Sequence, residues 1–297
     1  FAAPSHKGAH LFMRFRTPML SAAAMILAVG AVACSTDLAG PPPTLDDQTI
    51  DADIAATSGD AVASQITGFT DNVAAAGSFN MVSPSYNIVT SGGASARPAF
   101  NGISASCSYA DGRYSCAATT EGGMTVTRSF AFYDAQGNTV QNFDATKVES
   151  VNFHAQIDGN FQRDLFWSAG VHRSQDLTVS GLISMSPQRK WNGLGSGADT
   201  VTHIGFDGIR SLAGNAADTV NNVVMPGPDA ASQIPLSGNI VVGVDYTASL
   251  EGATGSVSKE VKRRVVVTFD GTNTPTLEIG SMTCLLHLDT HAVDSCQ

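Results

Sequence analysis

The feature that most constrains this chain is an alternation of apolar and polar side chains that begins near residue 100. In residues 151–157, Val, Phe, Ala and Ile alternate with Asn, His and Gln. Residues 124–132 and 261–269 also place apolar side chains on one parity, with Arg128 interrupting the first of these segments. Such alternation is typical of antiparallel strands that bury one face and expose the other.

Turn-forming residues separate the alternating segments and predict about ten strands. The turn signals are Asp111-Gly112, Gln136-Gly137-Asn138, Asp158-Gly159-Asn160, Pro226-Gly227-Pro228 and Asp270-Gly271. No series of long helical segments alternates with the strands, which disfavours a parallel α/β fold. We therefore expect an all-β domain over residues 78–297, built mainly from antiparallel sheet and arranged as a sandwich or as a curved, barrel-like layer.

One helix is expected before the sheet, over residues 48–77. Its apolar residues recur at helical spacing on one face: Val62, Ile66, Phe69 and Val73. Ser58 or Asp60 can cap its start, and Gly77 can end it. A single apolar stripe indicates a helix that packs against the sheet.

The N-terminal region has the pattern of an export signal. Two arginines, Arg14 and Arg16, precede the uncharged segment Met19–Ala33, which ends in small residues. The segment is shorter than the roughly 20 residues that cross a bilayer as a helix. Residues 1–12 precede a complete signal that starts at Met13, so we interpret them as upstream translation.

The end of this segment, Ala31-Val32-Ala33-Cys34, resembles the lipobox of bacterial lipoproteins, in which Leu is usual at the position of Ala31. The resemblance covers residues 13–35 only. It implies that residues 13–33 are a signal peptide, that the Cys34 sulfur carries a diacylglycerol, and that this lipid holds the protein on a membrane. Ser35, in place of an aspartate, points by the family's sorting tendency to the outer membrane, facing the periplasm or the cell surface.

Residues 34–47 contain Gly40-Pro41-Pro42-Pro43 and are expected to form a tether between the lipid and the domain. The chain is acidic, with 26 Asp and Glu against 16 Lys and Arg. A negative domain repels phosphate backbones, so a nucleic-acid partner is not expected. The main basic cluster is Lys259, Lys262, Arg263 and Arg264, which could meet lipid head groups or line a solvated strand edge.

Four cysteines follow Cys34, and an even number in an exported chain favours disulfides. A hairpin with Asp111-Gly112 as a two-residue turn places Cys107 opposite Cys116. The two would form a non-hydrogen-bonded pair with Cα atoms about 4.5 Å apart, within the range that a disulfide tolerates. The pair Cys284–Cys296 then follows by elimination. A zinc site is disfavoured because neither pair has the usual ligand spacing.

Three residues of one parity, His287, Asp289 and His291, have the chemistry of metal ligands. Alternate residues on a strand lie about 7 Å apart, so a straight strand cannot bring all three to one ion. We therefore interpret them as solvent-facing residues at a strand end and expect no metal and no other cofactor. Four aromatic residues could line a ligand cavity or fill the core: Phe161, Phe166, Trp167 and Trp191.

No coherent catalytic set is found, so the sequence predicts a non-enzymatic, lipid-anchored envelope protein with a binding or structural role. One alternative is a carrier of a lipid or another apolar ligand, because a curved sheet with a helix across its mouth can enclose a cavity. Another is a metal-dependent or other hydrolase. The partners expected besides the membrane are a small apolar ligand or another envelope protein.

Overall fold

In the computed structural model, the described residues are 43–76, 107–121, 123–141, 144, 146–183, 188–227 and 230–297. They form one helix, α1 (Asp47–Ala76), and thirteen strands. The expected signal peptide, Cys34 and most of the tether lie outside the described residues. The described part of the chain contains no helix with the length and hydropathy needed to cross a membrane.

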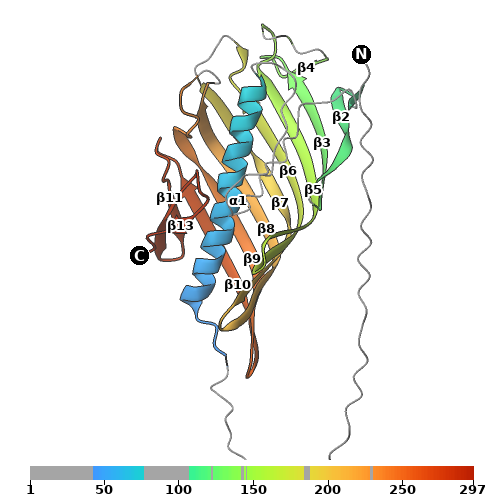
Figure 1. The fold of residues 1–297 in the computed structure, drawn as a ribbon. Coiled ribbons are helices and arrows are strands. Elements are labelled where there is room, and N and C mark those ends of the chain that lie inside the picture. Colours follow the sequence, from blue (N-terminus) through green and yellow to red (C-terminus); the bar gives the residue numbers. More distant parts are fainter. Residues whose placement is uncertain are drawn as a thin grey trace, which may run out of the picture. The chain divides into compact units, whose positions relative to one another are not determined.

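All thirteen strands belong to one antiparallel sheet, so the fold is all-β with one helix, as expected. The bounds are β1 Cys107–Ala110, β2 Arg113–Glu121, β3 Met124–Tyr133, β4 Thr139–Val140, β5 Ser150–Asp164, β6 Trp167–Ser180, β7 Gln188–Gly205, β8 Gly208–Pro226, β9 Ser237–Gly252, β10 Gly255–Thr268, β11 Thr276–Ile279, β12 Met282–Leu286 and β13 Val293–Asp294. Each strand pairs with its neighbours in the chain, except that β3 pairs with both β4 and β5. Of the expected arrangements, the structure has the single curved layer (Figure 1).

β5 is longer than the turn signals predicted, because one of those signals lies inside it. The Asp158-Gly159-Asn160 segment lies inside β5 and continues its pairing with β6. Gly159 has a positive φ of 151°, and a Cβ at this position would overlap the carbonyl oxygen of Gly123. Glycine is therefore used here for a close approach of two backbones and not for a turn.

The alternation predicted for β5 is confirmed, because Val151, Phe153, Ala155 and Ile157 are all buried. In β3, burial lowers the pKa of Arg128 to about 10. This side chain is therefore drawn well out of water, on the same parity as buried Val126 and Phe130. The interruption in the apolar pattern leaves the strand intact.

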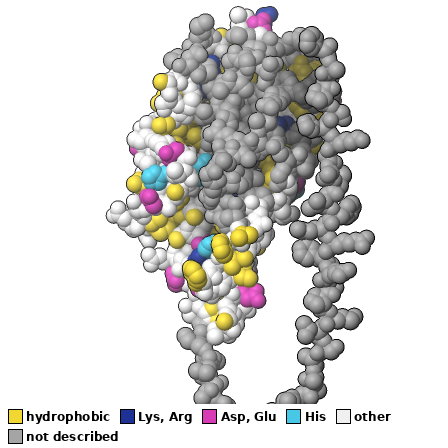
Figure 2. Space-filling view, viewed as in Figure 1, with side chains coloured by type: hydrophobic (Ala, Val, Ile, Leu, Met, Phe, Trp, Pro, Cys, Tyr) yellow, Lys and Arg dark blue, Asp and Glu magenta, His cyan; other side chains and the backbone are white. Residues whose placement is uncertain are grey.

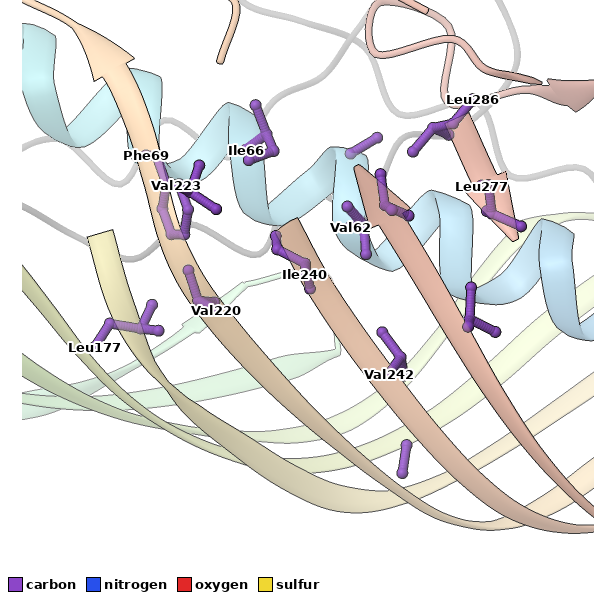
Figure 3. Packing of buried hydrophobic residues seen from close by; sticks show 14 of the residues in the cluster. Val62, Ile66, Phe69, Leu177, Val220, Val223, Ile240, Val242, Leu277 and Leu286 are labelled. Atoms are coloured by element: carbon purple, nitrogen blue, oxygen red, sulfur yellow. The ribbon is translucent and has the colours of Figure 1, made fainter. Parts of the chain in front are cut away.

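The helix α1 lies across one face of the sheet (Figure 1). Figure 3 shows the strands curving beneath it, with Val62, Ile66 and Phe69 in the same layer as Val220 and Ile240. The predicted stripe is confirmed at these three helix positions, each at most 4% exposed. The side chain of Val73 lies outside the described residues. Burial of this stripe holds the helix on the sheet.

The helix begins earlier than its predicted caps. Asp46 is the capping residue, and its carboxylate accepts a hydrogen bond from the Thr49 amide at 2.8 Å. The predicted caps Ser58 and Asp60 both lie inside the helix, so that prediction is wrong. The helix itself lies within one residue of the expected range 48–77 at each end, because Ile50 and Ile54, both buried, extend the apolar stripe toward the N-terminus. Gly77 lies outside the described residues.

Two residues of the basic cluster fasten the first turns of α1. Arg263 Nε donates to Asp51 Oδ1 at 2.6 Å, and Lys259 Nζ lies 2.9 Å from Asp47 Oδ1. Both side chains lie on the part of β10 that β11 does not cover. Lys259 stays exposed there, as expected of a solvated edge, whereas Arg263 is partly buried against the helix. Lys262 points away from the helix and pairs with exposed Asp245 at 2.6 Å.

The first hairpin has the predicted register. Asp111 and Gly112 form the turn with φ values of 50° and 79°, and Cys107 pairs with Cys116. The two cysteines form a disulfide with a Cα separation of 3.9 Å, somewhat shorter than expected. The second predicted disulfide, Cys284–Cys296, is also present. Two disulfides indicate an oxidising, non-cytoplasmic location for the domain.

Candidate functional site

The three residues considered as metal ligands do not come together. β12 ends at Leu286, and the chain then turns, so the residues do not lie on a strand. His287 Nε2 lies 3.2 Å from Asp294, whereas His291 Nδ1 lies 3.1 Å from Asp60 on α1. Asp289 is exposed. Within the described ranges, no group of three or more His, Cys, Asp or Glu side chains could hold a metal ion.

The expectation that His291 faces solvent is wrong. Its side chain is only 6% exposed, because the turn after β12 directs it onto α1 between Asp60 and Ser64. His291 adopts a positive φ of 59°, a conformation that the turn requires. His291 therefore joins the C-terminal segment to α1 through its contacts with Asp60 and Ser64.

A cluster of polar side chains is buried between α1 and the central strands. We call it the inner polar cluster and define it as Gln65, Arg173, Asp199, Asp218 and Tyr246. Arg173 Nε donates to Asp199 Oδ1 at 2.9 Å, and the Tyr246 hydroxyl donates to Asp199 Oδ2 at 3.3 Å. Gln65 Nε2 from the helix donates to Asp218 Oδ2 at 3.5 Å. Asp199 is therefore paired with the guanidinium of Arg173, and Asp218 is bonded to the helix through Gln65.

Burial raises the pKa of the Asp218 carboxyl, and the positive charge of Arg173 opposes that rise. The net direction is upward, so in this position the loss of hydration outweighs the attraction to Arg173. Asp199, with a bidentate contact to the same guanidinium, is the better satisfied of the two carboxylates.

The glycine run in β7 makes room for this cluster. The segment Gly193-Leu194-Gly195-Ser196-Gly197 lies within β7, where its glycines allow neighbouring chains to approach closely. A Cβ at Gly195 would overlap Asp218 Oδ1, and one at Gly193 would overlap the Asp176 carbonyl oxygen on β6. The Asp218 carboxylate can therefore lie over β7 only because residue 195 has no side chain.

A pocket of about 170 Å³ lies beside the inner polar cluster, between α1 and strands β6 to β8. Its polar and aromatic lining comes from Asp53, Asp60, Trp167, His203 and Arg210. Arg210 Nη1 lies 3.4 Å from Asp53 Oδ2, and Arg210 Nη2 lies 3.2 Å from His203 Nδ1. Arg210 Nε is buried and has no hydrogen-bond partner within the described residues.

The charges that line the pocket do not balance. Among the lining side chains, the two carboxylates of Asp53 and Asp60 outnumber the one guanidinium of Arg210. Asp60 also has a partner outside the lining, His291 Nδ1 at 3.1 Å. Burial raises the pKa of Asp53, and the charge of Arg210 opposes the rise. A positively charged guest would relieve that loss of hydration, because an opposite charge favours the ionised carboxylate.

Of the four aromatic residues considered for a cavity, only Trp167 lines this pocket. Trp191 is buried in the core, and Phe166 is exposed. The side chain of Phe161 lies outside the described residues. The pocket itself was not predicted, because its lining comes from α1, β6, β7 and β8, and a sequence pattern does not show how these align. No local sequence signal for the pocket was identified.

A comparison of the chain with protein-family models, with curated proteins and with solved structures finds no match. The geometry of the pocket and of its surroundings is therefore the basis for a functional proposal.

Proposed function

We propose that this chain is a lipid-anchored cell-envelope protein whose β domain binds a small organic cation in the pocket beside α1. The observation that carries the proposal is the pocket with its excess of negative charge and its indole wall. A concave site with a few converging polar groups is the usual form of a small-molecule site.

The ligand class follows from the lining. Asp53 and Asp60 can accept hydrogen bonds from an ammonium group, and the indole of Trp167 attracts cations through its π face. A volume of about 170 Å³ suits a molecule of a few carbon atoms more than a lipid chain, since sites for drug-sized ligands are about 300–1,000 Å³. Choline and putrescine represent the class.

The proposed location is supported by two features. The disulfides require an oxidising compartment, and the Ala31-Val32-Ala33-Cys34 segment resembles a lipobox. Loss of palmitate labelling in Cys34→Ala, together with accumulation of the precursor in globomycin, is the expected result. Export of an unlabelled wild-type protein cut at another site would contradict the anchor.

The alternative of an apolar carrier has less support. The face of the sheet that could enclose an apolar ligand is occupied by Val62, Ile66 and Phe69 of α1, which pack on the strands (Figure 3). A carrier would need α1 to leave this position, and the ion pairs of Asp47 and Asp51 with β10 oppose that movement.

Calorimetric titration of the purified protein with choline and with putrescine tests the ligand proposal. We expect putrescine binding that Asp53→Asn and Asp60→Asn each weaken about tenfold or more, the effect of losing one charged hydrogen bond. The quaternary nitrogen of choline has no N–H, so choline should be weakened through loss of the opposite charge alone. Asp245→Asn, a change of the same type at an exposed position that pairs with Lys262, is the matched control and should bind normally. Absence of binding by both cations, or equal binding by all variants, would overturn the proposal.

A further inference from the structure

A group of large apolar side chains is exposed at the end of the sheet where α1 begins. We call them the apolar tips: Leu165, Phe166, Ile204, Phe206 and Ile209. Phe206 is fully exposed and Leu165 is 80% exposed. Exposed aromatic rings at the tips of turns have no role in the stability of a soluble domain, and several together mark an interaction surface.

The apolar tips form one patch. They lie at two neighbouring turns, β5–β6 and β7–β8, and the Ile204 amide donates to the Phe166 carbonyl at 2.8 Å. Ile204 also pairs directly with Ile209 across the β7–β8 hairpin. Figure 2 shows hydrophobic side chains on the lower end of the domain, where α1 begins in Figure 1.

The chain enters the domain at this same end. A Cβ built at Gly252, in the β9–β10 turn, would lie 3.6 Å from Pro43 Cβ and 3.2 Å from the Asp207 carbonyl oxygen. Pro43, the first described residue, therefore lies close to the turn that carries Phe206. Cys34 precedes Pro43 by nine positions. Nine residues span at most about 30 Å when fully extended.

We propose that the apolar tips insert into the surface of the lipid bilayer that carries the Cys34 lipid. The inference rests on the proposed anchoring. A short connection that enters the domain beside the apolar tips keeps them near the membrane, and protruding rings suit the interface between head groups and acyl chains. The tips form a second contact, which sets the strands upright on the membrane.

The lipids that suit this contact are zwitterionic. Asp207 in the β7–β8 turn and Glu251 on β9, which pairs with Ile209, are exposed at this end and would repel anionic head groups. The contact is therefore driven by apolar burial and should change little with salt, in contrast to a contact made by a basic patch.

The position of Trp167, directly after Phe166, provides the test. The acylated protein is reconstituted into phosphatidylcholine vesicles with brominated acyl chains, which quench a nearby indole. We expect quenching of Trp167 fluorescence that is insensitive to salt. Trp167→Phe is the blank, since its remaining tryptophan, Trp191, is buried in the core and should not be quenched by lipid.

The double variant Phe166→Ser with Phe206→Ser should lose most of this quenching while it still floats with the vesicles. Leu236→Ser, which changes an exposed leucine in the β8–β9 connection, should keep it.

Flotation separates the two proposals. A wild-type protein that does not float with vesicles contradicts the anchor, whereas one that floats without Trp167 quenching overturns the inference about the tips. Quenching that survives in the double variant also overturns it. Crosslinking at residue 206 that yields a protein adduct, with no quenching by lipid, would assign the apolar tips to a protein partner or to a second copy and would likewise overturn the inference. Thermal melts check that the exposed substitutions leave the fold intact.

Discussion

The ring of Phe69 on α1 stacks on the indole of Trp191 on β7, with centroids 4.3 Å apart and planes 6° apart. Phe153 on β5 lies on the same indole, with its centroid 6.2 Å from that of Trp191. Three elements that are distant in the sequence therefore meet through one aromatic side chain. This stack fixes how far along the sheet the helix lies.

Substitution Phe69→Ala should leave a cavity over Trp191 and lower the free energy of unfolding by about 3–5 kcal/mol. Urea titration followed by tryptophan fluorescence measures the loss. Gln48→Ala, at an exposed position of the same helix, should stay within about 0.5 kcal/mol of the wild type. A small effect of Phe69→Ala would show that α1 is not docked as described.

Removal of the buried cation should be strongly destabilising. Arg173→Met leaves Asp199, which is 4% exposed, without its partner, and we expect a loss of about 3–5 kcal/mol in the free energy of unfolding. The double variant Arg173→Met with Asp199→Leu removes both charges and should recover much of this loss. Denaturant titrations of the three proteins at neutral pH provide the measurement. Equal stability of the single and double variants would contradict the pairing.

The stability should depend on pH through Asp218. Because burial raises the pKa of this carboxyl above its ordinary 3.8, the folded protein holds the proton more tightly than the unfolded chain does. Its stabilising contribution is therefore present in acid and is lost as the pH rises from the ordinary pKa through the raised one. Asp218→Asn should thus be more stable than the wild type at about pH 8, and this difference should disappear at about pH 4. The opposite trend in unfolding measurements would mean that Arg173 determines the pKa of Asp218.

The two local disulfides should make similar contributions. Replacement of Cys107 and Cys116 by Ser, or of Cys284 and Cys296 by Ser, should lower the free energy of unfolding by about 2–3 kcal/mol in each case, the entropy of closing a loop of this length. Reductant should destabilise the wild type by the sum of both effects and leave a variant without the four cysteines unchanged. A reductant-insensitive wild type, with free thiols before treatment, would contradict both bridges.

Local features of the sequence predicted local features of the fold. The register of the first hairpin followed from Asp111-Gly112 alone, because a two-residue turn determines which residues face each other. The burial of Val151 and Phe153 followed from alternation in the same way. The helix stripe was predicted at Val62 and the range of the helix was close, but its capping residue was not predicted, since Ile50 and Ile54 were not assigned to the same stripe.

The candidate site could not be predicted because it depends on register across many strands. Asp218 lies over Gly195 only through the pairing of β7 with β8, and Arg173 reaches Asp199 only through the pairing of β6 with β7. His291 was misplaced for a related reason, since its partner Asp60 is far away in the sequence. Long-range partners of this kind leave no periodic signal in one chain.

The pairing of consecutive strands has a consequence for the order of assembly. From β6 to β13, each strand bonds to the one synthesised just before it, so this part of the layer can grow by successive hairpins. The helix is made first, yet it contacts β9, β10, β11, β12 and β13. Trp191 on β7 can meet Phe69 earlier, but the apolar stripe has its complete binding surface only when nearly the whole polypeptide has emerged. We expect α1 to be the segment that a chaperone protects during biogenesis, and its docking to be the step that completes folding.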